Sequence, residues 1–363
     1  MINRKSTLMA AAALLLAMPA AAQRTQKFTA DKNNEYGLTY ELPTTKVRIY
    51  ATAQKTVKKA GPFWKYAKKY LGTTDVVTAD SQTWELTGVS LVSYGEPDHS
   101  QQFFMQFKAG QAPFIMKTAD DLLLAINSEN TLPSTPTLQT SQGRETALDN
   151  NNYLSSLSGD ILASESLSKR AELAAQQIYK IRQSRTDYTT GEAETMPDGA
   201  ALKLIMQRLD EQEAELTALF VGTTSTSTAS TAFGYNPGTD DISDVVAFRV
   251  SDVNGLVDKT DLSGEPVYLS MRVLNRGKLP VNEKGETKKL PKDAVIYRIP
   301  GKAQFTLTYK GKQMATTDFD LAQLGVDFGL DPDLFTNKKQ QSYVKLSPST
   351  GAVIELGNVS AQQ

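Results

Sequence analysis

The stretch "KVRIYATA", residues 46–53, decides the fold class of this chain. Its side chains alternate, with Val47, Ile49, Ala51 and Ala53 on one side and longer polar side chains or threonine on the other. A period of two is typical of a strand that packs one face and leaves the other in water. The stretch therefore predicts an antiparallel β-strand with one buried face.

Similar patterns follow this strand along the chain. In "WELTGVSL", residues 84–91, the apolar side changes phase at Gly88, which predicts a β-bulge at that glycine. Phe103 and Met105 belong to another alternating run, and residues 114–126 are expected to complete the same sheet. We expect an N-terminal antiparallel β domain over residues 23–131.

One short helix interrupts these strands. The segment "GPFWKYAKKYLG", residues 61–72, has proline near its start and glycine at its end, and Phe63, Ala67 and Tyr70 share one helical face.

The middle of the chain predicts two longer helices, over residues 164–188 and 198–220. Both show apolar side chains at spacings of three and four residues. Because the connection is short, they should form an antiparallel helical hairpin over residues 164–222, acting as a rigid spacer between two sheets. Residues 132–163, which come before it, are rich in serine, threonine and asparagine and predict a long loop or linker.

The C-terminal part returns to a period of two. "TTSTSTASTAFGY", residues 223–235, favours a polar strand over disorder, because threonine is a good strand former. Residues 267–273 and 303–309 alternate clearly. The overall fold class is α+β and mainly β: two antiparallel β domains, the C-terminal one (residues 223–363) sandwich-like, joined by the helical hairpin.

The first residues predict export. Arg4 and Lys5 precede an apolar run over residues 8–18, Pro19 follows it, and residues 20–22 are alanines. This pattern is typical of a secretory signal peptide, here residues 1–22. The protein is expected in the periplasm or outside the cell.

Composition narrows the functions further. No later apolar run is long enough for a transmembrane segment, and a chain with Cys 0 can carry neither a lipid anchor on cysteine nor a disulfide. A formal net charge of −1 gives no broad attraction to nucleic acid. With no glycine-rich nucleotide loop and a single histidine, no cofactor or metal is expected.

Enzyme motifs are weak. Ser166 and Lys169 fit the S-x-x-K spacing of penicillin-binding enzymes, but the companion motifs are incomplete, so Ser166 is better interpreted as a helix cap. His99, the lone histidine, is expected in a solvated turn, and residues 252–261 have glycine in the wrong position for a calcium loop. An envelope glycan hydrolase that uses paired carboxylates is the rival functional hypothesis.

Two surfaces are candidates for a role. Aromatic and basic side chains gather in the short helix, where Trp64, Lys65, Lys68 and Lys69 form a possible interaction surface for sugars or an anionic polymer. The alternative is that the rings belong to the core and the lysines to a solvated helix face.

Arg182 and Arg185 form the second candidate. They lie one turn apart near the predicted hairpin connection, where Glu192 and Asp198 are expected to complete a structural ion-pair cluster.

Several stretches also resemble a known family, domain-of-unknown-function family 4831 (DUF4831) of secreted envelope proteins in Bacteroidota. They lie in order along the chain as "YGLTYELP", "GPFWKYAKKYLG", "IRQSRTDYTTGE", "DGAALKLIMQRLDEQE", "LFVG", "LSGEPVYL", "YRIPGKAQF" and "SPSTGAV". The resemblance implies no activity, cofactor or catalytic residue. The sequence as a whole predicts a non-catalytic binding or scaffolding component of the envelope, whose partner is an envelope protein or glycan.

Overall fold

The computed structural model describes residues 24–27, 37–106, 112–132, 157–336 and 341–359. Within them the chain is mainly β, with three antiparallel sheets and one pair of long helices in contact, which confirms the predicted fold class. The predicted signal peptide and residues 133–156 of the predicted linker lie outside the described residues. No helix in the described part of the chain combines the length and apolar character needed to cross a bilayer.

Two very long strands form the first sheet. β2 (Gly37–Lys59) has 23 residues and β3 (Ser81–Gln106) has 26 residues, and they pair antiparallel over most of their length. At about 3.3 Å per residue, β2 alone spans roughly 75 Å. β1 (Arg24–Lys27) and β6 (Thr223–Tyr235) complete the sheet in the order β1-β3-β2-β6.

The decisive stretch, residues 46–53, lies in the middle of β2. Its burial alternates as predicted, with the apolar side chains buried and the others half-buried. The register of β2 and β3 shifts where Thr52 lies opposite Gly88 and Ala53 opposite Leu86, so Thr87 is the extra residue. The β-bulge predicted at the phase change is confirmed.

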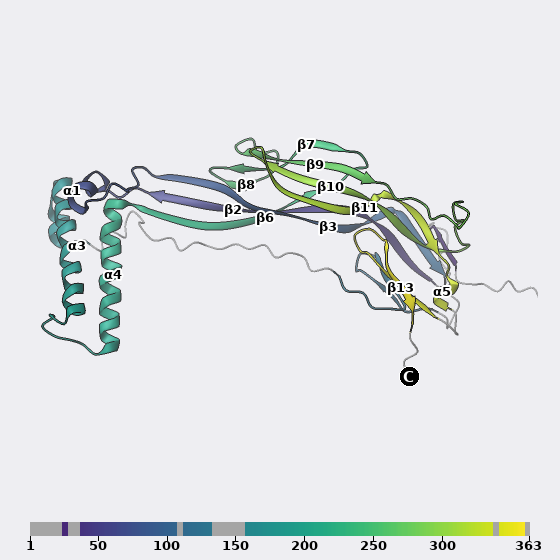
Figure 1. Cartoon of the computed structure of the whole chain (residues 1–363), viewed down its shortest axis with the longest axis horizontal. Helices are drawn as coiled ribbons and strands as arrows, with labels where there is room; N and C mark the ends of the chain where they lie inside the picture. Colours follow the sequence, from purple (N-terminus) through teal and green to yellow (C-terminus); the bar gives the residue numbers. More distant parts are fainter. Residues whose placement is uncertain (1–23, 28–36, 107–111, 133–156, 337–340, 360–363) are drawn as a thin grey trace, which may run out of the picture.

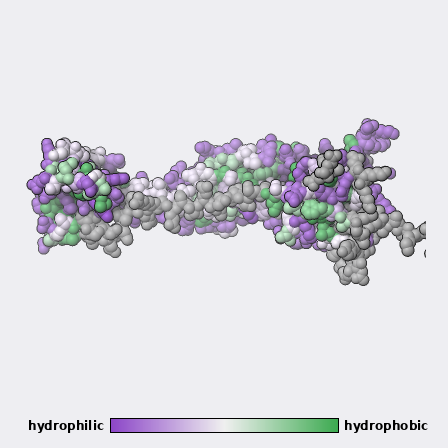
Figure 2. Space-filling model, turned by 90° about the horizontal axis from the view of Figure 1, so that it is seen from below, coloured by the Kyte–Doolittle hydropathy of each residue, from purple (hydrophilic) through white to green (hydrophobic). Residues whose placement is uncertain are grey.

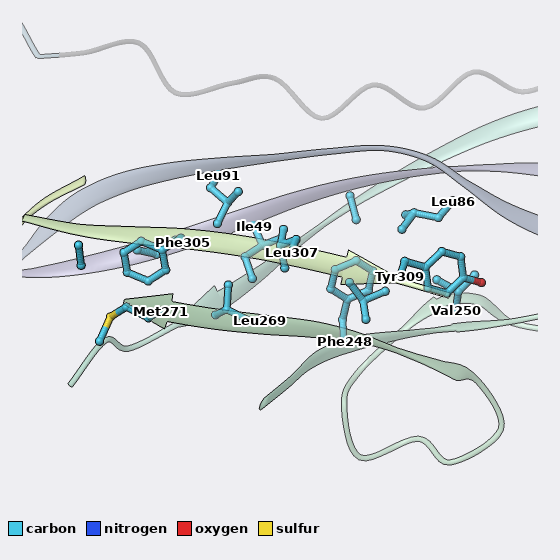
Figure 3. Packing of buried hydrophobic residues seen from close by; sticks show 14 of the residues in the cluster. Ile49, Leu86, Leu91, Phe248, Val250, Leu269, Met271, Phe305, Leu307 and Tyr309 are labelled. Carbon is cyan, nitrogen blue, oxygen red and sulfur yellow. The ribbon is translucent and has the colours of Figure 1, made fainter. Parts of the chain in front are cut away.

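The second sheet has five strands in the order β11-β10-β9-β7-β8. They are β7 (Ile242–Ser251), β8 (Gly255–Val257), β9 (Glu265–Asn275), β10 (Val295–Tyr309) and β11 (Lys312–Leu330). This sheet packs on the first, and together they form a sandwich whose core is shown in Figure 3. Ile49 of the first sheet and Phe248, Leu269 and Phe305 of the second are at most 1 % exposed.

The third sheet combines two strands within residues 115–126 with the last two described strands. It runs β13-β12-β5-β4, with β4 (Ile115–Lys117), β5 (Leu123–Ile126), β12 (Ser342–Leu346) and β13 (Val353–Asn358), and α5 (Asp333–Thr336) precedes β12. The prediction that residues 114–126 complete the first sheet is therefore wrong. All four residues of β5 are buried, so this strand needs cover on both faces and pairs with the C-terminal β12.

The two predicted β domains are not separate in space. β6, from the predicted C-terminal domain, pairs with β2, and β12 pairs with β5. Strand pairing follows available edges and apolar faces rather than chain order, so the predicted boundary between residues 222 and 223 separates strands that share one sheet.

Two buried side chains, Tyr40 of β2 and Arg298 of β10, link these strands at this end of the molecule. The buried Tyr40 hydroxyl accepts a hydrogen bond from the Ile296 amide (2.9 Å) and donates to the same residue's carbonyl (3.2 Å). Arg298, 8 % exposed, donates to Asp327 (2.7 Å) and to the Pro43 carbonyl (3.2 Å). These buried polar groups are paired, so the junction of sheets has one defined geometry.

The helices other than α5 stand at the opposite end of the long sheet (Figure 1). The predicted short helix is present as a 3₁₀ turn, η1 (Trp64–Tyr66), followed by α1 (Ala67–Leu71). A helix within the predicted linker, α2 (Gly159–Ala163), leads into α3 (Leu167–Thr190), which packs beside α4 (Gly199–Val221). We call η1 and α1 to α4 the head.

The hairpin of α3 and α4 lies between the β regions in chain order, as predicted, but it is not a spacer between two sheets. β2, β3 and β6 instead continue beyond the sandwich and meet the head at their ends (Figure 1). The threonine-rich stretch is β6, a strand as predicted, and its residues are half-buried or exposed along its length. Because threonine combines strand propensity with a hydroxyl, it suits a sheet whose faces are incompletely covered.

Candidate interaction surface on the head

A tight joint fixes the head to the end of the long sheet. The Phe63 amide donates to the Leu219 carbonyl (2.8 Å), and the Val77 amide donates to the Val221 carbonyl (2.8 Å). The rings of Phe63 and Phe220 lie 5.4 Å apart in the buried cluster that holds η1, α1, α3 and α4 together. The direction in which the head points is therefore set by backbone bonds as well as by packing.

Glycine is required at this joint. Gly222 ends α4 with φ 81 and ψ −171, a conformation that is essentially restricted to glycine. A Cβ atom there would also lie 2.4 Å from the Lys59 carbonyl oxygen. The close approach of α4 to the end of β2 thus depends on the missing side chain.

The chain that enters the joint carries only positive charge. Residues 42–74 contain eight basic residues and no acidic one, namely Lys46, Arg48, Lys55, Lys58, Lys59, Lys65, Lys68 and Lys69. In the structure these residues follow β2 from the sandwich into η1 and α1. A chain that is nearly neutral overall is therefore strongly basic along this path.

The four predicted surface residues lie together on η1 and α1. Trp64 is half-buried, while Lys65, Lys68 and Lys69 are exposed. The Lys65 ammonium lies 5.5 Å from the centre of the Trp64 ring, within the range of a cation–π contact. We call these four residues, with Tyr66 and Tyr70, the cation–aromatic surface.

The tyrosines of this surface are neither fully core nor free. Tyr66 and Tyr70 are half-buried against the apolar cluster, with ring centres 6.2 Å apart. The Lys69 ammonium lies 4.7 Å from the centre of the Tyr70 ring and donates to its hydroxyl (3.2 Å). Phe63 and Ala67 are buried, so the segment is divided between core and surface.

Helix α3 extends the surface. The Tyr179 hydroxyl donates to the Tyr70 carbonyl (2.6 Å), and the Tyr179 side chain is 51 % exposed. The Arg182 guanidinium lies 5.8 Å from the centre of the Tyr179 ring. Sequence reasoning missed Tyr179, although its place three residues before Arg182 on the polar side of the helix was a usable signal.

The lysines of the surface have no acidic partner in the described part of the chain. No ion pair involves Lys65, Lys68 or Lys69 there, whereas Lys59 at the joint pairs with Asp80 (3.4 Å). Asp80 accepts a hydrogen bond from the Ala60 amide, which with Lys59 lowers its pKa below the ordinary value for aspartate. One lysine of the basic segment thus fastens the joint, and the three on η1 and α1 face solvent.

The two predicted arginines lie elsewhere on the head and pair with α4. Arg182 donates to Glu213 (2.6 Å), and Arg185 contacts both Asp210 and Glu213 (each 2.8 Å). The bond to Asp210 and the charge of Glu213 raise the pKa of Arg185 above its ordinary value. These contacts brace α3 against α4 across the hairpin.

The acids expected as their partners lie nearer the connection. α3 continues to Thr190, so at about 1.5 Å per residue Arg185 lies roughly 8 Å before the helix end. Glu192 follows that end, and Asp198 instead caps α4 by accepting a bond from the Ala201 amide (2.8 Å). The antiparallel packing brings Asp210 and Glu213 opposite the arginines.

The structure also places the other residues considered for catalysis or metal binding, namely Ser166, His99 and residues 252–261. The Ser166 hydroxyl caps α3 at the Lys169 amide (3.5 Å), as predicted. His99 lies in β3 rather than in a turn, and its Nδ1 contacts the buried carboxylate of Glu41 (2.8 Å). Within residues 252–261, Asp258 accepts bonds from Thr260, as turn aspartates do.

Two acidic side chains of the head, Asp210 and Glu213, meet at the same guanidinium nitrogen of Arg185 (each 2.8 Å), but larger acidic groups are not formed in the described residues. There, no group of three or more histidine, aspartate or glutamate side chains could hold a metal ion. A pocket of about 530 Å³ at the joint has Asp75 and Lys58 among its lining residues, and one of about 390 Å³ beside the third sheet has Glu129. Each of these pockets therefore offers one carboxylate.

Four carboxyl groups in the described residues have a clearly shifted pKa, and in each of them the pKa is lowered. They are Asp80, Asp258, Asp261 and Glu355. In Asp80, Asp258 and Asp261 the lowering comes mainly from hydrogen bonds to nearby amide or hydroxyl groups, and in Glu355 from Tyr343 and Lys345. A general acid needs the opposite shift, because it must hold a proton near neutral pH.

The molecule is thus an elongated, mainly β protein that carries a helical head with a cation–aromatic surface; in Figure 2 the head forms its own lobe at one end. The chain belongs to a family described as "Domain of unknown function (DUF4831)", whose model matches residues 36–354. No curated protein and no solved structure matches this chain.

Proposed function

We propose that this protein is a non-catalytic binding or scaffolding component of the cell envelope, exported to the periplasm or the cell exterior. The observation that carries the proposal is the position of the head. It stands at the end of strands that are 23 and 26 residues long, away from the sandwich, and it presents Trp64 beside lysines that no described acid neutralises.

The division of labour between the two ends supports this function. The sandwich holds a large apolar cluster and the buried bonds of Arg298, so it supplies a stable base. The head is fixed to that base by a joint of backbone hydrogen bonds and exposes charged and aromatic groups. A rigid base and a distant contact surface are what a component needs if it must reach a partner.

The four carboxyls whose pKa is lowered, Asp80, Asp258, Asp261 and Glu355, are not candidates for the general acid of a hydrolase. Glycoside hydrolysis needs two carboxyls, one of them holding a proton at neutral pH. The shifted carboxyls bond to amide, hydroxyl or ammonium groups that keep them ionised. Those contacts are typical of turns and surface pairs.

Affinity capture from intact envelopes tests the proposal. The tagged chain is cross-linked in cells, purified and examined by mass spectrometry, beside a chain in which Lys65, Lys68 and Lys69 are changed to glutamine. We expect one defined envelope component to be recovered with the native chain and depleted with the variant.

An opposite outcome is equally clear. If the purified chain hydrolyses a cell-wall polymer and loses that turnover when one aspartate or glutamate is changed to its amide, the protein is an envelope hydrolase. Export is checked separately by cell fractionation, and a chain that stays in the cytoplasm with residues 1–22 intact contradicts the proposed location.

A further inference from the structure

We infer that the ligand of the cation–aromatic surface is a linear polysaccharide that carries carboxylate or phosphate groups. This inference rests on the proposed binding function and names the chemical class of its ligand. The charge of the surface, the position of its rings and the inward packing of the neighbouring apolar side chains each narrow the class of ligand.

The positive charge of the surface indicates an acidic ligand. Residues 42–74 hold eight basic residues without an acid, and the last three of these, Lys65, Lys68 and Lys69, project from η1 and α1. Within the described chain they form no ion pair, so their charge is available to a ligand. The three lysines are all exposed and lie within five consecutive residues, so their ammonium groups are near one another on the short segment. A polymer with repeated acidic groups can meet several of them at once.

The aromatic rings of the surface indicate that the ligand contains sugar rings. Trp64, Tyr66 and Tyr70 are half-buried, and the two tyrosines pack against the buried cluster of the head. A half-buried ring loses little side-chain entropy when a ligand packs on it. Sugar rings offer C–H groups to the electron-rich face of an aromatic ring and hydroxyl groups to its polar rim. Half-buried rings beside ammonium groups therefore fit an acidic sugar better than a simple anion.

A membrane surface fits less well. A segment that lies in a bilayer interface turns its apolar side chains outward, into the lipid. Here Phe63 and Ala67 are at most 2 % exposed and pack inward on α3 and α4, and the rings that do reach the surface are half-buried and lie among lysines. The outward side keeps its lysines in water.

A protein partner also fits less well. The centres of protein interfaces are depleted in lysine because its charge and side-chain entropy make burial costly. On this surface three lysines lie among three rings, so a protein would have to bury or displace them. A hydrated polysaccharide leaves the ammonium groups partly in water.

Binding to polymers of known composition tests the inference. The probes are polygalacturonate for carboxylate groups, phosphorylated dextran for phosphate groups and unmodified dextran as the neutral comparison, each titrated into the purified full chain by calorimetry. We expect one of the acidic polymers to bind at least about tenfold more tightly than dextran, because several exposed cations each contribute a few-fold. Binding should weaken as salt is raised.

Matched variants separate this surface from general charge. Changing Lys65, Lys68 and Lys69 together to glutamine should weaken acidic-polymer binding about tenfold. Changing the same three to arginine should preserve it. The control changes Lys284, Lys288 and Lys289 to glutamine in the exposed loop between β9 and β10, which removes equal charge and should leave binding unaltered. Circular dichroism and the emission of Trp84 confirm that each variant folds.

Three results would overturn the inference. They are equal binding by the glutamine variant and the native chain, equal weakening in the loop control, and binding to vesicles of phosphatidylcholine and phosphatidylglycerol in preference to both acidic polymers. If no polymer binds but capture from envelopes recovers a protein through the same lysines, the inference fails while the proposed function stands. If neither polymer nor envelope component is bound, both fail.

Discussion

The sandwich and the head of this protein are stabilised in different ways. In the sandwich, two sheets bury side chains such as Phe305 and Leu269 completely, and polar residues such as Arg298 are paired inside. In the head, a separate apolar cluster holds the helices, charges lie on the outside, and the attachment combines packing with backbone bonds to Leu219 and Val221. The large apolar core of the sandwich and the candidate interaction surface therefore lie at opposite ends of the molecule. A substitution in one region should leave the other region unaltered.

The two tryptophans allow the two ends to be followed separately. Trp64 lies in the head, and Trp84 packs against the sandwich core. Because the chain has Trp 2, replacing either one by phenylalanine leaves a single reporter.

The largest effect is expected in the sandwich. Phe305→Ala removes a fully buried ring from the core and should lower the free energy of unfolding by about 3–5 kcal/mol. Urea denaturation followed through Trp84 measures it. Phe319→Ala, on a neighbouring ring 5.7 Å away that is only half-buried, is the control and should cost clearly less. Equal losses would mean that the core does not lie where the sheets place it.

A smaller effect is expected at the joint. Gly222→Ala places a Cβ atom against the Lys59 carbonyl in a glycine-only conformation and should cost about 2–4 kcal/mol, mostly in the head. Hydrogen exchange of α4 amides and Trp64 emission should respond, while Trp84 emission should change little.

Gly72→Ala is the matched control for this joint. Gly72 also has positive φ, but a Cβ there meets no atom within 4 Å, so strain alone should cost about 1 kcal/mol. If Trp84 emission changes as much as Trp64 emission in the Gly222 variant, the head and the sandwich unfold as one unit. That result would contradict their independent stabilisation.

The third prediction concerns the junction of sheets. Tyr40→Phe leaves the Ile296 amide without its partner and should cost about 1–3 kcal/mol by urea denaturation at neutral pH. Tyr343→Phe is the control, since that hydroxyl bonds the exposed Glu355 and its loss should matter little.

Alkaline pH sharpens this prediction. Burial raises the pKa of Tyr40 far above its ordinary value, partly offset by the bond to Ile296. The unfolded phenol ionises near pH 10 while the folded one keeps its proton. The associated stability is therefore complete below about pH 10 and falls as the pH rises further. Tyr40→Phe should make the free energy of unfolding fall less steeply with pH above about pH 10. An unchanged slope would contradict the burial of the Tyr40 hydroxyl.

The smallest effect is expected at the hairpin connection. Asp198→Ala removes the cap of α4 and should cost about 1 kcal/mol in thermal unfolding monitored through Trp64. Asp198→Asn should cost less than half of that, because asparagine caps as well as aspartate. If asparagine is as harmful as alanine, the charge of Asp198 matters and the residue belongs with the ion pairs after all.

Local patterns were sufficient for most elements. Residues 46–53 predicted their strand because alternation reports directly on one buried face, and Gly88 marked the bulge because the phase changed there. The caps at Ser166 and Gly72 were readable because capping is set by neighbours in the sequence. The candidate surface was also local, since Trp64 and its lysines lie within one short segment.

Pairings between distant segments were not readable. Arg182 was assigned acids near the connection, but the length of α3 and its packing on α4 put it opposite Glu213. Tyr179 joined the surface through a bond to Tyr70, 109 residues away in the chain. Such contacts depend on where helices lie in space, which the spacing within one helix does not encode.

The sequence by itself determined the mainly β class, the helical pair, the family and the basic, aromatic character of residues 61–72, because these depend on composition and on neighbours within a few positions. Only the tertiary structure decided that β6 and β12 pair with strands from the first third of the chain and that the head stands at one end of a long sheet. A strand edge can pair with any compatible strand, so the choice is made by the packing of the whole molecule.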